Sequence, residues 1–184
     1  MRAWNEPDIP RLPGDGPLPH VHDTASGAKT RLSVTDVASI YVCGITPYDA
    51  THIGHANTYL AFDTLYRLLV DAGLEVRYAQ NTTDVDDPLL ERADATGRDW
   101  RELAEEQTDL FRRDMEALGI VPPDFYIAVT ERIEEISAAV AELEEKGMAY
   151  RVEGDVYFDN AAAQAVSPWV LGEGSNLDRA TMLA

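Results

Sequence analysis

The chain has 184 residues, of which 45% are hydrophobic and 26% charged, and this composition suits a folded domain with a hydrophobic core. No run of apolar residues approaches the roughly 18 of a membrane span, and the residues after Met1 hold no apolar signal core, so we expect a cytoplasmic protein without a membrane partner. The net charge of −18 argues against a nucleic-acid partner, because nucleic-acid interfaces are normally basic.

The first strand of the predicted fold follows a long lead-in. Residues 1–36 are rich in proline, glycine and aspartate and show no sustained hydrophobic period, so we expect an extended segment with one short strand near Val21. The apolar run at 38–42 then predicts a buried parallel strand, which ends at the turn formed by Cys43 and Gly44.

A helix and a second strand follow directly. Apolar residues at helical spacing predict a helix over 53–72, and Gly73 ends it as a C-cap. Residues 74–79 predict the second strand. Strand, helix and strand in this order predict a right-handed βαβ unit, and therefore an α/β fold.

The next part of the chain is predicted to be helical. Two acidic helices are expected near 88–95 and over 100–118, and the pair Pro122-Pro123 interrupts the pattern. A further helix is expected over 130–146, with one apolar face that consists of Ile133, Ile136, Val140 and Leu143.

The end of the chain carries a hairpin pattern. Residues 149–152 and 155–158 predict two short strands that turn at Glu153-Gly154. The residues after Asp159 show a looser pattern.

The segment from Tyr41 to His55, YVCGITPYDATHIGH, joins the first strand to the first helix. Open α/β sheets bind ligands at such a junction, where the free N–H groups of the helix start attract phosphate. Gly54 lets a ligand approach the backbone closely. His52 and His55 lie one helical turn apart, so both can face one ligand and stabilise charge on a transferring phosphate.

Each of these residues also has a simpler interpretation. His52 and His55 could be half of a metal site or ordinary surface histidines. Cys43, the only cysteine, could be a buried strand residue rather than a ligand. Thr83 could serve as the N-cap of the following helix, and Asp84, Asp86 and Asp87 are interpreted mainly as capping or network residues.

Taken together, three segments resemble the class I aminoacyl-tRNA synthetases and their relatives, and specifically the cysteine-activating branch of that family. They are Tyr41–His55, Asn81–Asp87 and Val156–Phe158, so the resemblance covers most of the chain. It implies a Rossmann-like class I synthetase nucleotide-binding fold, a parallel sheet flanked by helices that is incomplete here. Residues 1–36 would be the lead-in, and 37–184 would be the first half of the catalytic domain with a helical insertion, truncated at its C-terminus.

The resemblance also assigns roles to residues. His52 and His55 would be catalytic, and Cys43 would be a zinc ligand, because an open position on zinc can bind the sulfur of a cysteine substrate. ATP would be a substrate, accompanied by Mg²⁺. The other zinc ligands and a lysine-rich mobile loop of the family lie in a later segment that this chain lacks. The adenylate pocket would be lined by Cys43, Gly44, Ile45, Thr46, Gly54, Thr58, Asn81, Thr82 and Thr83.

Two kinds of relative share this architecture. One charges tRNA with cysteine, and the other joins cysteine to the amine of glucosaminyl-inositol. Four segments resemble the second kind: Ala56–Tyr59, Pro88-Leu89, Pro47–Thr51 and Ser175–Ala184. Members that charge tRNA usually carry an arginine near position 57 and a lysine after the paired aspartates, and this chain has neither, although its Asn57 departs from the alanine expected in the second kind. This implies small-molecule partners, namely L-cysteine, ATP and glucosaminyl-inositol, and a monomeric parent protein. The alternatives are a fragment of a cysteine–tRNA ligase and a non-catalytic, truncated half-domain.

Overall fold

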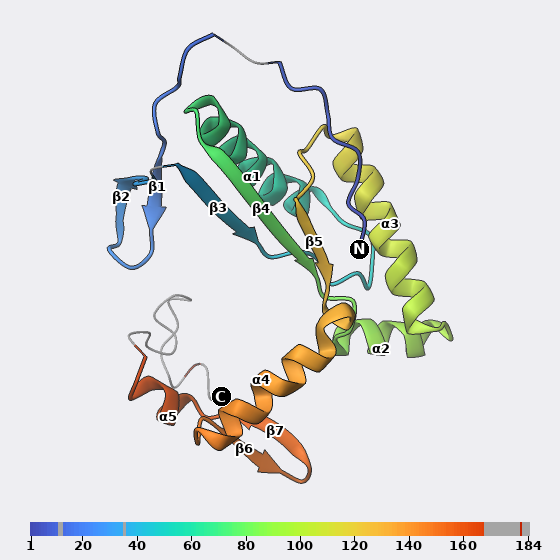
Figure 1. Ribbon diagram of the computed structural model, residues 1–184. Helices are drawn as coiled ribbons and strands as arrows, with labels where there is room; N and C mark the ends of the chain where they lie inside the picture. The colour runs from blue at the N-terminus through green and yellow to red at the C-terminus, as the bar shows by residue number, and fades with distance from the viewer. Residues whose placement is uncertain (11–12, 35, 168–180, 182–184) are drawn as a thin grey trace. The chain divides into compact units, whose positions relative to one another are not determined.

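The computed structural model describes residues 1–10, 13–34, 36–167 and 181 (Figure 1). Its contacts divide the chain into two compact units, Met1–Glu131 and Arg132–Ala184. Within the described residues, no helix combines the length and the apolarity of a membrane span. The similarity noted at Ser175–Ala184 lies, apart from Thr181, outside the described residues.

A three-stranded parallel sheet forms the centre of the first unit (Figure 1). Its order is β3 (Val37–Val42), β4 (Glu75–Thr82) and β5 (Phe125–Ala128), and the register places Val42, Gln80 and Tyr126 side by side. The two strands predicted at 38–42 and 74–79 are confirmed, with the second extended by three residues. The expected α/β fold, a parallel sheet flanked by helices, is confirmed as well.

Helices make both connections of this sheet, because parallel neighbours need a crossover. Helix α1 (Ile53–Asp71) joins β3 to β4, and α2 (Asp87–Thr96) with α3 (Trp100–Ala117) joins β4 to β5. All three predicted helices are confirmed. Asp99 starts α3, since its side chain accepts hydrogen bonds from the N–H groups of Arg101 and Glu102.

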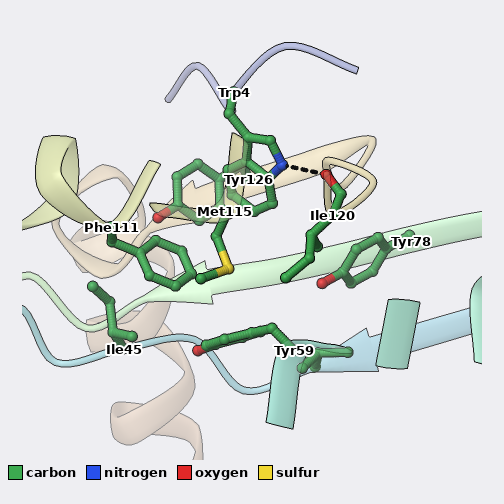
Figure 2. Packing of buried hydrophobic residues seen from close by; sticks show 9 residues of the cluster. Trp4, Ile45, Tyr59, Tyr78, Phe111, Met115, Ile120 and Tyr126 are labelled. Carbon is green, nitrogen blue, oxygen red and sulfur yellow. Dashed lines mark hydrogen bonds between the residues drawn. The ribbon is translucent and has the colours of Figure 1, made fainter. Parts of the chain in front are cut away.

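The hydrophobic core lies on one face of the sheet, beneath α1 and α3 (Figure 2). Its centre includes Trp4, whose indole N–H donates to the Ile120 carbonyl over 2.7 Å and whose ring contacts Phe111 and Tyr126 edge-on. The start of the lead-in is thus part of the core. The buried members are Trp4, Val42, Ile45, Tyr59, Tyr78, Phe111, Met115, Ile120 and Tyr126.

The opposite face of the sheet is open. Side chains alternate along a strand, so Val37, Tyr41 and Phe125 point away from the core, and they are 39%, 63% and 55% exposed. Parallel sheets normally have both faces covered. Among the described residues, the sheet therefore has one covered face and one open face.

The lead-in also contains an antiparallel hairpin of β1 (His20–Asp23) and β2 (Ala28–Arg31). The strand predicted near Val21 is confirmed, whereas its partner was not predicted. Asp23 accepts hydrogen bonds from the N–H groups of Ala25 and Ser26, which stabilises the turn.

In the second unit, the predicted helix and hairpin are both confirmed. A 3₁₀ turn η1 (Val129–Arg132) precedes α4 (Ile133–Glu145), so the predicted helix is regular only after its first turn. The strands β6 (Ala149–Val152) and β7 (Asp155–Phe158) match the prediction. A short helix α5 (Asn160–Gln164), begun by Asp159, was not predicted.

Candidate active site at the strand ends

His52 and His55 form the first turn of α1 by capping it. His52 is the N-cap residue, and its Nδ1 accepts a hydrogen bond from the N–H of Gly54 over 3.0 Å. His55 Nδ1 in turn accepts from the backbone N–H of His52 over 3.2 Å. This reciprocal pattern is a capping box built from imidazoles instead of the usual hydroxyl and carboxamide groups. The two ring centroids lie 4.1 Å apart.

The capping box fixes which nitrogen of each ring carries the proton. Because Nδ1 accepts in both rings, the neutral form of each must carry its proton on Nε2. Partial burial and the neighbouring His52 both lower the pKa of His55, so its neutral form is favoured. Each Nε2–H is left out of the capping box, which leaves two donors available for an anionic ligand.

Gly54 is required by the same geometry. A Cβ atom at this position would lie 2.8 Å from Cε1 and 2.9 Å from Nδ1 of the His52 ring. Any other residue would force the His52 ring to shift from the position in which it caps the helix. The glycine that was predicted to admit a ligand therefore also keeps His52 in place.

The ends of β3 and β4 also lie very close together, at Gly44 and Asn81. A Cβ atom on Gly44 would lie 1.5 Å from the carbonyl oxygen of Asn81, so only glycine fits. Asn81 Oδ1 accepts from the Gly44 N–H over 2.8 Å and from the Tyr41 hydroxyl over 3.0 Å, and its Nδ2 donates to Thr83 Oγ1. The N–H of Thr83 donates to the Ile45 carbonyl. Asn81 is thus the centre of the polar network at the strand ends.

The side chains of several predicted pocket residues do not belong to this polar network. Ile45 is buried in the core, and Thr82 is fully buried on the core face of β4. Thr46 is half-buried in the loop after β3. Thr58 is exposed on α1, where its hydroxyl donates to the Gly54 carbonyl. The structure brings together Cys43, Gly44, Asn81 and Thr83, while it places Ile45 and Thr82 in the interior.

The aspartates after β4 have structural partners. The N-cap of α2 is Asp86, not Thr83, because its carboxylate accepts from the N–H of Asp87. The capping role considered for Thr83 is therefore wrong. Asp84 accepts from both the N–H and the hydroxyl of Thr130, which ties the end of β4 to η1. The prediction of capping or network roles is confirmed for Asp84 and Asp86.

Cys43 lies exposed at the carboxyl end of β3, and its carbonyl accepts a hydrogen bond from the Tyr59 hydroxyl. Exposure leaves the thiol accessible to a metal or a ligand. Within the described residues, however, no group of three or more histidine, cysteine, aspartate or glutamate side chains could hold a metal. A structural or catalytic zinc site needs at least three protein ligands. These residues alone therefore do not make a zinc site.

Two contacts that sequence reasoning did not reveal hold the loop before His52. The Thr51 hydroxyl donates to Asp114 of α3 over 2.9 Å, and Arg92 of α2 forms an ion pair with Asp49 over 3.3 Å. Asp114 lies 63 residues from Thr51. No local pattern in the sequence indicates a contact over that separation.

Open α/β sheets bind ligands at the carboxyl ends of their strands and at helix starts. This chain has a glycine-dependent junction of two strand ends and a capped histidine pair at such a helix start. The family model for the catalytic domain of tRNA synthetases class I (C) matches residues 30–177. The chain therefore belongs to the class I tRNA synthetase family, as the sequence resemblance predicted.

Within that family, the chain is similar to curated proteins named L-cysteine:1D-myo-inositol 2-amino-2-deoxy-alpha-D-glucopyranoside ligase. It is 56% identical to the protein of Clavibacter michiganensis over 100% of this chain and 46% of that protein. It is 58% identical to the protein of Streptosporangium roseum over 89% of this chain and 40% of that protein. The chain thus spans about half the length of the curated relatives it matches.

Solved structures show the same fold. Methionyl-tRNA synthetase of Mycobacterium tuberculosis, in complex with methionyl-adenylate, matches with a TM-score of 0.57 and 27% identity over 63% of this chain and 23% of that chain. A leucyl-tRNA synthetase of Agrobacterium radiobacter K84 matches with a TM-score of 0.58 and 20% identity over 71% of this chain and 16% of that chain. The Rossmann-like fold of class I synthetases is confirmed.

Proposed function

We propose that this chain is part of an ATP-dependent ligase that activates L-cysteine as cysteinyl-adenylate and joins it to the amine of glucosaminyl-inositol in mycothiol biosynthesis. The similarity to ligases of that name carries the proposal, because it reaches 56% identity over the whole chain. In this proposal, residues 37–184 are the first half of the catalytic domain, and 1–36 precede it.

The first step is adenylate formation. A carboxylate oxygen of cysteine attacks the α-phosphorus of ATP, and the bond to the pyrophosphate oxygen breaks. The Nε2–H groups of His52 and His55 point away from the capping box and can donate to phosphate oxygens. The N-terminal end of α1 adds a partial positive charge at the same place. The site therefore suits a polyphosphate whose negative charge moves during the reaction.

The second step forms the amide. The amine nitrogen of glucosaminyl-inositol attacks the acyl carbon of cysteinyl-adenylate, AMP leaves with the anhydride oxygen, and the amine loses a proton. In this proposal, Asn81 and Thr83 at the end of β4 hydrogen-bond the adenylate, and Gly44 keeps the ends of β3 and β4 close together. These polar groups orient the substrate rather than react with it.

In this proposal, a bound zinc ion would select cysteine as the substrate by binding its sulfur. Cys43 would supply one thiolate, and the remaining ligands would come from the part of the longer relatives that this chain does not cover. Mg²⁺ would accompany ATP. We also place the protein in the cytoplasm, where ATP is available, as a monomer.

The rival function, charging tRNA with cysteine, uses the same first step. The net charge of −18 disfavours it, because a tRNA partner needs a basic surface.

The test is to supply the full-length protein with ATP, cysteine and either glucosaminyl-inositol or tRNA. Formation of the cysteinyl amide with release of AMP and pyrophosphate is expected. Efficient charging of tRNA without an amide product would contradict the proposal. In the same preparation Cys43→Ser should reduce the zinc content, since a hydroxyl is a poor ligand compared with a thiolate.

A further inference from the structure

The loop between β3 and α1 is fixed firmly at its beginning. Gly44 donates to Asn81 and the Ile45 carbonyl accepts from Thr83, so the first residues are bonded to the end of β4. Ile45 and Pro47 are buried. This part of the loop has little freedom to move.

The end of the loop, just before His52, depends on fewer contacts. In the part of the chain that the structure describes, two side chains outside the loop hydrogen-bond to residues 48–51. One is Arg92, whose ion pair with Asp49 is 48% and 59% exposed. Such exposed pairs contribute little, because water and salt screen them. The other is Asp114, whose Oδ2 accepts from the half-buried Thr51 hydroxyl over 2.9 Å.

Thr51 directly precedes the N-cap of α1. The backbone of His52 is extended, with φ −126° and ψ 176°, and its ring accepts a hydrogen bond from the N–H of Gly54, two residues further along the chain. A shift of Thr51 would therefore move the N-cap, and both imidazoles would move with it.

We propose that Asp114 is a positioning residue for the histidine pair. Asp114 is placed on α3, does not belong to the strand-end network and acts through Thr51 alone. By holding the Thr51 hydroxyl, it fixes where α1 begins and where the two Nε2–H groups point. This inference rests on the proposed function, because the step that it affects is adenylate formation.

A purely structural hydrogen bond would give a different result. Its loss would lower the stability of the fold and leave the rate per folded molecule unchanged. A positioning bond affects the rate itself, because a misplacement of about 1 Å can slow a reaction by about 100-fold. The two roles are thus separated by kcat and melting temperature measured on the same variants.

The experiment uses the full-length protein and cysteine-dependent exchange of pyrophosphate into ATP. Thr51→Val removes the donor at nearly constant shape, and Asp114→Ala removes the acceptor. Each should lower kcat by roughly 10- to 100-fold, with an unchanged KM for cysteine and a melting temperature close to that of the wild type. Thr51→Ser and Asp114→Asn keep a hydroxyl and an oxygen acceptor, so both should restore most of the rate.

Thr64→Val is the matched control. Thr64 lies on the same helix as the histidines, and its exposed hydroxyl donates to the Leu60 carbonyl without contacting the loop. This variant should keep the wild-type kcat. The double variant Thr51→Val/Asp114→Ala should be no slower than either single variant, because both remove the same bond. An unchanged kcat in Thr51→Val, or losses that multiply in the double variant, would overturn the assignment.

A second measurement does not require activity. The imidazole ¹⁵N resonances of His52, assigned with the His52→Gln variant, should shift in Thr51→Val and stay in place in Thr64→Val. If the wild type shows no exchange but these resonances shift, the proposed reaction fails while the positioning contact stands. Unshifted resonances would overturn the positioning contact whatever the activity.

Discussion

Single side chains at the start of α1 serve the fold and the proposed chemistry at the same time. The sequence predicted that His52 and His55 share a face, but it did not show that they cap the helix they begin. Histidine is not among the preferred N-cap residues, which are asparagine, aspartate, serine and threonine. In the proposed function, histidine is useful at this position because an Nε2–H remains outside the capping box.

The two roles can be separated by substitution. The double variant His52→Ser/His55→Gln restores an ordinary capping box of the form Ser-x-x-Gln without imidazoles. We expect its melting temperature to match the wild type, while pyrophosphate exchange in the full-length protein falls by about 100- to 1000-fold. His52→Ala should lose the exchange activity and, in addition, about 1 kcal/mol of unfolding free energy. Exchange within a few-fold of wild type in the Ser/Gln variant would remove the histidines from the chemistry.

The sequence predicted the elements that have a repeated apolar spacing or a clear turn residue. The helices at 53–71 and 100–117 carry a repeated apolar spacing, and the β6–β7 hairpin has Gly154 at its turn. Strand β5 was missed because it has four residues and follows two prolines. At the candidate site, the residues named from the sequence lie within short motifs. The contact of Asp114 with Thr51 was not predicted, because it joins segments far apart in the chain.

Helix α1 is tied to the segment that follows α3 by a buried carboxylate. Asp63 accepts from the N–H of Val121 over 2.8 Å and from Arg67 Nε over 2.7 Å, and Arg67 donates to the Gly119 carbonyl. Asp63 is only 9% exposed. These hydrogen bonds hold α1 against the segment after α3, on the core face of the sheet.

Removal of Asp63 should therefore be costly. Asp63→Ala leaves the Val121 N–H and Arg67 Nε without their acceptor, and we expect the free energy of unfolding to fall by about 2–3 kcal/mol. Asp63→Asn keeps an acceptor for Val121 and should lose less. Urea unfolding measures both. Glu75→Ala, which breaks an exposed pair with Arg77, is the control and should cost about 1 kcal/mol or less. Equal losses of unfolding free energy in the two alanine variants would show that the hydrogen bonds of Asp63 stabilise the fold no more than an exposed ion pair does.

At the scale of the whole molecule, the open face of the sheet is the main feature. Val37, Tyr41 and Phe125 are exposed on a parallel sheet, which normally has both faces covered. The relatives are about twice as long as the chain, so the remaining part of such a protein has the length to cover this face.

The 184-residue chain on its own should therefore be inactive and self-associating. We expect no pyrophosphate exchange, little zinc retained through purification, and concentration-dependent association in sedimentation measurements. Phe125→Arg on the open face should reduce the association. Leu118→Arg, at an exposed position after α3, is the matched control and should not. Cysteine-dependent exchange by the isolated chain would contradict the proposal that part of the active site is supplied by residues outside this chain.

The place of Trp4 in the core has a consequence for synthesis on the ribosome. Its partners Phe111, Ile120 and Tyr126 emerge more than 100 residues after it, and its hydrogen bond closes a loop of 116 residues. The strands β3 and β4, with α1 between them, can pair long before that point, because their contacts are local. Trp4 is thus translated well before the partners that bury it, and it reaches its final place late. Until Ile120 has left the ribosome, the surface that Trp4 will cover stays exposed to chaperones.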